Sequence, residues 1–407
     1  MKENRKGDIF MSLVNTPSGN RLHIGIFGKR NSGKSSLLNA ITGQGIALVS
    51  EVKGTTTDPV SKAMEIHPIG PCLLIDTAGF DDTGDLGNMR IEKTKAVLDK
   101  TDVAVVVFSD MQMELETQWI AMLRQRKIPI LAVVNQVDRI EQVQEIKRQI
   151  EQRFSLTPLL VSAKEKTGIS QMKHEILRLM PPDFEAQSLT GSLVQPEDVV
   201  LLVMPQDKQA PKGRLILPQV QTIRDLLDNH CVVMCVTTEQ LSTALQELAK
   251  PPKLIITDSQ AFAQVYPLKP AETLLTSFSI LLAAYKGDLS AFVKGANALD
   301  SLTDDSHVLI AEACTHAPLQ EDIGRVKIPN MLRKKYGEHL QVTVVSGSQF
   351  PKDLSEYQLI IHCGACMFNR KHVLTRVEQA EQQGVPITNY GVVLAKLTGI
   401  LDRISMQ

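Results

Sequence analysis

The chain has 407 residues, of which 43% are hydrophobic, and a formal net charge of −1 at pH 7. This length is typical of two or three domains with packed cores. A pI near 6.8 gives no reason to expect nucleic acid or an anionic membrane as the main partner. No apolar stretch reaches the roughly 18 residues of a membrane span, and the polar first residues lack the apolar core of a signal peptide. We therefore expect a cytoplasmic protein.

Six cysteines are spread along the chain. Without a secretion signal they are expected to stay reduced, which favours metal binding or burial over disulfides. Cys231 and Cys235 lie in the apolar run CVVMCVT, and we expect both in the core.

Residues 1–19 are expected to form a flexible N-terminal segment. In residues 20–183, strand-like and helix-like segments alternate. The strand-like runs are RLHIGIFG, CLLIDTAG, VAVVVFSD, IPILAVVNQVD and TPLLVSA. Each run ends in polar residues, and helical patterns such as SSLLNAITG lie between them. This alternation predicts a parallel sheet with helices on both faces.

A phosphate-binding loop follows the first strand. The segment from Gly28 to Ser35 matches the pattern G-x-x-x-x-G-K-[ST] between a predicted strand and a predicted helix. Its backbone N–H groups can wrap a phosphate, Lys34 can neutralise phosphate oxygens, and Ser35 can offer a hydroxyl to Mg²⁺. The residues expected to bind the nucleotide here are Gly28, Asn31, Ser32, Gly33, Lys34, Ser35 and Ser36.

Asp76-Thr77-Ala78-Gly79 ends a second strand. There the Asp76 carboxylate can reach Mg²⁺ through water, and the Gly79 N–H can contact a γ-phosphate. Two further strand ends carry groups that suit a guanine base. Asp138, in the run Asn135-Gln136-Val137-Asp138, can accept both the ring and the exocyclic N–H groups of guanine, and Ser162-Ala163-Lys164 can add a backbone contact.

In order and spacing, these motifs resemble the motif set of the small GTPases. Asn31 and the run Gly54-Thr55-Thr56-Thr57-Asp58 resemble the potassium-stimulated TrmE/Era-like branch. The resemblance implies that GTP is hydrolysed with Mg²⁺ and K⁺. It also implies that Asn31 holds K⁺, that Thr56 (with Thr55 as second choice) binds Mg²⁺, and that Lys34, Asn31 and Thr56 are catalytic.

Two positions depart from the GTPase pattern. Phe80 stands where Ras-like proteins place a glutamine that orients water, so we expect slow intrinsic hydrolysis. Asp81, Asp82 and Asp85 are acidic alternatives that the sequence does not rank. Gln136 replaces the usual lysine, which predicts weaker nucleotide binding with guanine preference retained.

The rest of the chain repeats the α/β rhythm in two smaller units. Residues 195–302 contain the strand-like runs VVLLVMP, CVVMCVT and KLIITDS, and residues 303–407 contain HVLIAEAC, QVTVVSG and YQLIIHC. We therefore predict an α/β protein in which a P-loop GTPase domain is followed by two smaller α/β units with mainly parallel sheets.

Five side chains that can bind metals lie in the last unit: Cys314, His316, His362, Cys363 and Cys366. They form two patches, Cys314–His316 and His362–Cys366, which both follow predicted strands, where open α/β sheets place ligands. Gly364 is expected to allow the tight turn between the last two cysteines. Three thiolates and a histidine could close a tetrahedral zinc site. The same set could hold a four-iron cluster through three thiolates.

The combination of a GTPase with CxH and HCxxC patches resembles the iron–iron (FeFe) hydrogenase maturation GTPase family, HydF, over the whole chain. The resemblance implies a [4Fe–4S] cluster on Cys314, Cys363 and Cys366, with His316 or His362 as candidate fourth ligand. It also implies a homodimer formed by the middle unit. Finally, it implies a scaffold that takes a di-iron precursor from radical-SAM maturases to apo FeFe hydrogenase.

Two other functions fit the same residues. One is a translation or ribosome-assembly GTPase with a structural zinc site, although the chain lacks a basic tail that would bind RNA. The other is an iron–sulfur redox sensor gated by GTP.

Overall fold

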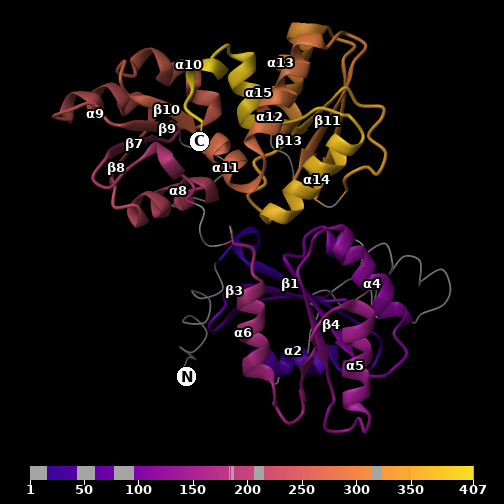
Figure 1. Cartoon of the computed structure of the whole chain (residues 1–407). Helices are drawn as coiled ribbons and strands as arrows, with labels where there is room; N and C mark the ends of the chain where they lie inside the picture. Colours follow the sequence, from indigo (N-terminus) through magenta and orange to yellow (C-terminus); the bar gives the residue numbers. More distant parts are fainter. Residues whose placement is uncertain are drawn as a thin grey trace, which may run out of the picture. The chain divides into compact units, whose positions relative to one another are not determined.

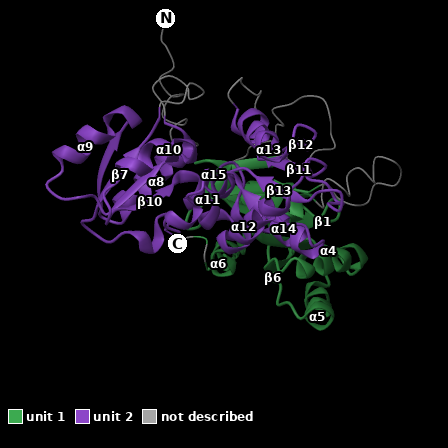
Figure 2. Cartoon of the chain, turned by 90° about the horizontal axis from the view of Figure 1, so that it is seen from above, with its two compact units in different colours: residues 1–185 green, residues 186–407 purple. Residues whose placement is uncertain are grey.

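The computed structural model describes residues 16–43, 60–77, 96–182, 184, 188–205, 215–313, 322–347 and 349–406. The chain forms two compact units, Met1–Glu185 and Ala186–Gln407 (Figure 2). Among the described residues, no helix is both long and apolar enough to cross a membrane.

The first unit contains a six-stranded mixed sheet in the order β2-β3-β1-β4-β5-β6 (Figure 1). Its strands are β1 (Leu22–Gly28), β2 (Val60–Ile66), β3 (Gly70–Asp76), β4 (Val103–Phe108), β5 (Ile130–Val134) and β6 (Leu159–Leu160). Only the β2–β3 pair is antiparallel among these described strands. Its labelled helices are α2 (Lys34–Thr42), α4 (Glu114–Gln125), α5 (Val143–Phe154) and α6 (Ile169–Leu179).

Strand burial explains why this sheet is recognisable in the sequence. Every residue of β1 and β4 is buried, as expected of central parallel strands that are covered on both faces. Ile24 and Ile26 pack in one hydrophobic cluster with residues of α2 and α6. Phe27 packs in a second cluster with residues of α4 and α5.

The second unit contains two four-stranded sheets, both parallel, in the orders β10-β9-β7-β8 and β12-β11-β13-β14. The first sheet consists of β7 (Val199–Val203), β8 (Val232–Val236), β9 (Leu254–Thr257) and β10 (Leu274–Ser277). The second consists of β11 (His307–Glu312), β12 (Gln341–Ser346), β13 (Leu359–His362) and β14 (Ile387–Asn389). The predicted fold class is therefore confirmed.

Helices α11 and α12 lie between these two sheets (Figure 1). The labelled helices of this unit are α8 (Leu217–Asp228), α9 (Leu241–Glu247), α10 (Phe262–Val265), α11 (Phe278–Lys286), α12 (Leu289–Ala296), α13 (Ile328–Tyr336), α14 (Arg370–Gln382) and α15 (Tyr390–Leu397). One hydrophobic cluster contains Leu201 of the first sheet, Leu309 of the second, and Ile280 and Phe292 of the intervening helices. The boundary expected near residue 302 thus lies between two sheets that share a core. That it is a boundary between domains stays a prediction.

Strand β8 lies at the edge of its sheet, and no described strand pairs with its outer side. Val232 is 57% exposed, and Cys235 is also exposed. The expectation that Cys235 lies in the core is therefore wrong, whereas Cys231, just before the strand, is buried as expected. An apolar run predicts a strand, but does not distinguish a central strand from an edge strand.

Candidate nucleotide and metal sites

The loop that follows β1 is shaped for a phosphate. Gly28 and Gly33 have positive φ angles of +156° and +83°. A Cβ atom on Gly33 would lie 2.4 Å from Nδ2 of Asn135, and one on Gly28 would lie 2.8 Å from the Val107 carbonyl oxygen. Helix α2 begins at Lys34, immediately after Gly33, so its unpaired N–H groups and positive dipole end favour an anion.

Lys34 lies inside this loop. Its side chain is buried, and Nζ donates to the carbonyl oxygens of Gly28 at 2.9 Å and Lys29 at 2.7 Å. The ammonium group is therefore held at the loop that would wrap a phosphate. Of the other expected loop residues, Ser32 is buried and donates its hydroxyl to the Lys29 carbonyl, whereas Asn31 and Ser36 are exposed.

Ser35 and Asp76 form a pair suited to Mg²⁺. The Ser35 hydroxyl donates to Oδ2 of Asp76 at 3.0 Å, and Oδ1 of Asp76 is buried without a hydrogen-bond partner. Burial raises the pKa of Asp76, and the nearby Lys34 ammonium opposes that rise. Oxygen ligands of this kind fit the preference of Mg²⁺. Thr56, Thr55, Gly79 and Phe80, as well as Asp81, Asp82 and Asp85, lie outside the described residues.

The expected base-binding residues lie together at the ends of β5 and β6. Nδ2 of Asn135 donates to the Ser32 carbonyl at 3.0 Å, and its Oδ1 accepts from the Ala163 N–H at 3.2 Å. Asp138 accepts from the Ser162 hydroxyl at 2.6 Å, and this bond is the main reason that its pKa is lowered. Asn135 thus joins the phosphate loop to the loop of residues 162–164, whose Lys164 side chain is exposed.

Gln136 takes part in the same network. Its Nε2 donates to the backbone carbonyl oxygen of Asn31 at 2.8 Å. Asn31 itself has a φ of +63°, a conformation that asparagine adopts more readily than most residues. The substitution of glutamine for lysine therefore keeps a contact with the phosphate loop, while the expected loss of nucleotide affinity stays a prediction.

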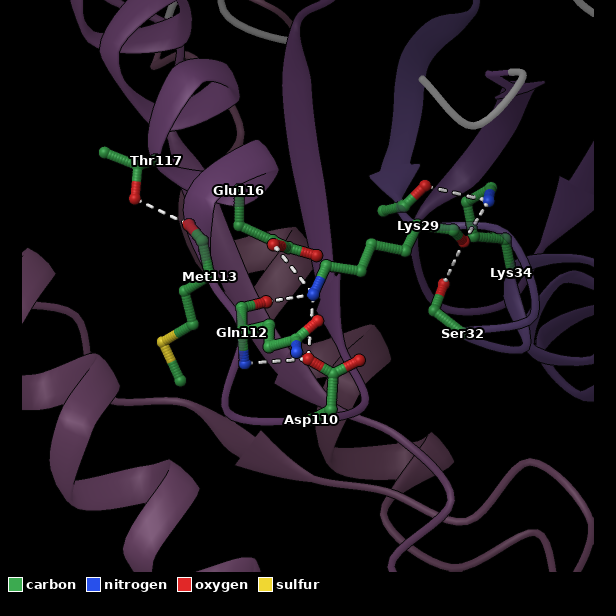
Figure 3. Close-up of polar contacts among 9 residues, drawn as sticks. Lys29, Ser32, Lys34, Asp110, Gln112, Met113, Glu116 and Thr117 are labelled. Carbon is green, nitrogen blue, oxygen red and sulfur yellow. Dashed lines mark hydrogen bonds and ion pairs between the residues drawn. The ribbon is translucent and has the colours of Figure 1, made fainter. Parts of the chain in front are cut away.

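Lys29 anchors the phosphate loop, and the sequence analysis did not single it out. Figure 3 shows its side chain extending toward the loop after β4 and the first turn of α4. Nζ lies 2.8 Å from Oδ1 of Asp110 and 3.9 Å from Oε2 of Glu116, and it also donates to the Gln112 carbonyl. Glu116 is 2% exposed, so this anchor extends into the core.

Two of the expected metal ligands lie where β13 ends. Sγ of Cys363 accepts from the backbone N–H groups of Ala313 at 3.0 Å and Ala365 at 3.4 Å. Burial raises the pKa of Cys363 to about 11, and these two N–H donors oppose that rise. A bound metal removes the thiol proton, and donors already directed at the sulfur stabilise the resulting thiolate.

Cys366 is half-buried, while Cys314 and His316 lie outside the described residues. Among the residues that the structure does describe, no group of three or more His, Cys, Asp or Glu is arranged to hold a metal. The N–H donors on Cys363 nevertheless suit a thiolate ligand. Ala313 immediately precedes Cys314 in the chain, so one of those donors lies directly beside the first cysteine patch.

The turn after Cys363 differs from the expected one. Ala365 has a φ of +52°, whereas the φ of Gly364 does not lie in the left-handed region. Among the described atoms, a Cβ atom on Gly364 would meet only Cδ1 of Leu282, at 4.0 Å. The expectation that Gly364 supplies the conformational freedom of this turn is therefore wrong, because the strained position belongs to Ala365.

His362 is buried, and both of its ring nitrogens have partners. Nη1 of Arg376 lies 3.0 Å from Nε2, and Nδ1 lies 2.9 Å from the Cys363 carbonyl oxygen. Because guanidinium only donates, Nε2 accepts and the Nδ1–H group donates. Burial, followed by the charge of Arg376, lowers the pKa of His362 to about 3. In this arrangement His362 must lose a hydrogen bond before it can bind a metal.

Three cations around this turn were missed by the sequence analysis. Arg376 packs between the rings of Phe350 and Phe368, at 4.8 Å and 4.7 Å from their centroids. Lys286 contacts a backbone carbonyl of the turn itself, and Arg370 contacts one just after α11. The helix dipole favours a lysine at the end of any helix. The position of Lys286 in the sequence therefore gives no sign of a role at the site.

Comparison with known families divides the chain into three matched regions. Residues 23–136 match the family described as "50S ribosome-binding GTPase". Residues 189–287 match "Hydrogen maturase F dimerization domain", and residues 290–406 match "Hydrogen maturase F tetramerization domain".

Individual relatives match the GTPase region. The chain is 33% identical over 172 residues to GTPase Der of Wolinella succinogenes, covering 39% of this chain and 36% of that protein. It is 38% identical over 162 residues to the tRNA modification GTPase MnmE of Bordetella petrii, covering 39% and 33%. The chain thus spans about a third of the length of these curated relatives. Among solved structures, Aquifex aeolicus Era bound to GDP·AlF4− matches with a TM-score of 0.35 at 19% identity, covering 53% of this chain and 92% of that one.

The Lys29 anchor generates a stability prediction. Replacing Lys29 with Met removes a charged hydrogen bond to Asp110 and leaves buried Glu116 without this cation, so we expect a loss of about 2 kcal/mol in the free energy of unfolding. Thermal unfolding with and without GDP measures both the loss and any weakening of nucleotide binding. Lys147→Met removes an exposed helical pair with Glu151 and should cost no more than about 0.5 kcal/mol. Equal losses in the two variants would contradict the anchor.

Proposed function

The chain belongs to the hydrogen maturase F family, and we propose that it is a GTP-hydrolysing scaffold for hydrogenase maturation. In this proposal it holds a [4Fe–4S] cluster, accepts a di-iron precursor from radical-SAM maturases in the cytoplasm and delivers it to apo FeFe hydrogenase. The observation that carries the proposal is the Cys363 sulfur with its two backbone N–H donors, within the region that matches the tetramerization domain.

We assign GTP hydrolysis to the first unit. Lys34 and the N-terminus of α2 bind the phosphates, Ser35 and Asp76 hold Mg²⁺ with Thr56, and Asp138 reads the guanine ring. Asn31 holds K⁺ beside the phosphates. The Asn31 carbonyl is fixed by Gln136, which supports a defined loop conformation for such an ion. Without a glutamine at position 80 the intrinsic rate is slow.

The potassium site makes a prediction about salt dependence. Hydrolysis of GTP by the full chain should be faster in K⁺ than in Na⁺ at equal ionic strength, by on the order of tenfold or more, since a cation at the phosphates stabilises charge in the transition state. Steady-state phosphate release measures this difference. Asn31→Ala should hydrolyse GTP at the same slow rate in both salts. Equal rates for the unsubstituted chain would remove K⁺ from the proposal.

For the cluster, we assign Cys314, Cys363 and Cys366 as ligands. Three thiolates leave one iron for a fourth ligand, and when bound the cluster supplies an iron site that can exchange ligands. His362 already donates to a carbonyl and accepts from Arg376, so we assign His316 as the histidine that competes for this iron. Zinc bound by the same cysteines is the alternative, and it would suit a ribosome-assembly role.

Metal analysis tests this assignment directly. The anaerobically purified full chain should contain about four iron and four sulfide per chain, with no stoichiometric zinc. Cys363→Ser and Cys366→Ser should each lose most of the iron, because serine is a poorer ligand for iron–sulfur clusters. Cys72→Ser is the matched control, since this buried cysteine lies in the first unit. Zinc in place of iron would refute the scaffold and favour the alternative.

We further propose that the middle region forms the homodimer through β8. This edge strand pairs with β7 on its inner side, and no described strand pairs with its outer side. Exposed edge strands readily pair with another chain. The exposed Val232 and Cys235 lie on β8, within the match to a dimerization domain. A second copy of this chain is therefore the proposed occupant.

A charge on this edge should weaken the dimer. Val232→Asp places a carboxylate where a partner strand would pack, so we expect the molecular mass in solution to fall toward that of a monomer at low micromolar concentration. Sedimentation velocity measures the mass. Leu268→Asp is the control, because Leu268 is also exposed but precedes β10 at the opposite edge of the sheet. If only Leu268→Asp dissociates the protein, β8 is not the interface.

A further inference from the structure

Lys286 is a buried lysine at the end of α11 whose ammonium contacts the cysteine turn. It is 1% exposed. Nζ donates to the carbonyl oxygens of Ala365 at 3.3 Å, Cys366 at 3.1 Å and Phe368 at 2.7 Å. These acceptors belong to the segment that begins with Cys363 and contains the strained residue Ala365.

The number of hydrogen-bond acceptors around Nζ indicates that Lys286 is protonated. Three carbonyl oxygens take three N–H donors, and only the protonated ammonium has three. A buried positive charge requires compensation, yet no carboxylate among the described residues forms an ion pair with Lys286. Carbonyl dipoles supply part of this compensation. The sulfurs of Cys363 and Cys366 lie close enough to interact electrostatically with the ammonium, and once a bound metal has removed their protons their negative charge can supply the rest.

Arg370 makes a reciprocal contact. Its Nη1 donates to the carbonyl oxygens of Tyr285 at 3.0 Å and Gly287 at 2.8 Å, with a longer contact to Ala284 at 3.4 Å. The end of α11 therefore takes part in two contacts: its Lys286 side chain bonds to the cysteine turn, and its own carbonyls accept from Arg370 at the start of α14. Both contacts join the end of α11 to the last part of the chain, and those of Lys286 are made to the turn that carries the cysteines.

We propose that Lys286 is a positioning residue for the metal site: its ammonium holds the turn from Cys363 to Phe368 in its ligand-binding shape and offsets the charge of the cysteine thiolates. This rests on the proposed cluster site. Partners that orient ligands and tune the local charge typically affect metal affinity by about 10–100-fold. A buried cation beside a cluster also favours its reduced, more negative form, so it raises the reduction potential.

The test compares Lys286→Met with Arg370→Met in the anaerobically loaded full chain. For Lys286→Met we expect about tenfold faster loss of iron to a chelator, a reduction potential shifted to more negative values, and a changed electron paramagnetic resonance spectrum of the reduced cluster. Arg370→Met should change the potential and the spectrum less, because the carbonyls of Tyr285 and Gly287 that Arg370 contacts lie at the end of α11. A purely structural role would give the two variants the same loss of stability and no change in potential.

Hydrogen exchange in the metal-free full chain provides a second readout. Amides of residues 363–368 should exchange faster in Lys286→Met than in the unsubstituted chain. If Lys286→Met fails to fold, Lys286→Gln keeps two N–H donors without the charge and should still shift the potential downward. Unchanged potential, spectrum and exchange in a folded neutral variant would overturn the proposal. Absence of any iron–sulfur cluster in the unsubstituted chain would instead refute the proposed function, and the exchange experiment would still report on the turn.

Discussion

Backbone carbonyls and N–H groups at the ends of parallel strands determine both candidate sites. Where a parallel strand ends, its last polar groups have no neighbour in the sheet, and side chains or ligands must satisfy them. In the first unit this edge carries the phosphate loop after β1, Asp76 at the end of β3 and Asn135 after β5. In the second unit it carries His362 at the end of β13 and Cys363 just after it, with the N–H of Ala313 supplied from just after β11.

Hydrogen bonds and ion pairs that join these loops to other parts of the chain then give the two sites a defined geometry. Asn135 bonds both to the phosphate loop and to the loop at Ala163, and Lys29 ties the same phosphate loop to buried Glu116. At the other site Lys286 performs the corresponding task with three carbonyls. In each case a contact between a loop that would bind the ligand and a distant part of the chain fixes that loop, which is how loops reach the precision that binding requires.

The sequence predicted what depends on local pattern. Fully buried strands such as β1 and β4 read as continuous apolar runs, and the phosphate loop is a contiguous motif, so the fold class and the nucleotide motifs could be recognised. Lys286 could not, because its acceptors lie 79 to 82 residues further along the chain and are backbone atoms without a sequence signature. Cys235 was misplaced for a related reason, since only the strand order makes β8 an edge. At the cysteine turn, Gly364 was expected to allow the tight turn, but the left-handed conformation occurs at Ala365.

His362 illustrates how the surroundings of a residue can change its chemical role. From the sequence it is a candidate ligand equal to His316, since each histidine lies within two residues of a cysteine. In the folded chain its ring lies between a carbonyl and the Arg376 guanidinium, and burial with that neighbouring charge strongly disfavours the protonated ring. A neutral histidine with a fixed tautomer can hold Arg376 beside Phe368, and Phe368 ends the segment whose carbonyls accept from Lys286. His362, Arg376 and Lys286 thus act on one turn from different sides, so the geometry of the cysteines depends on α11, β13 and α14 together.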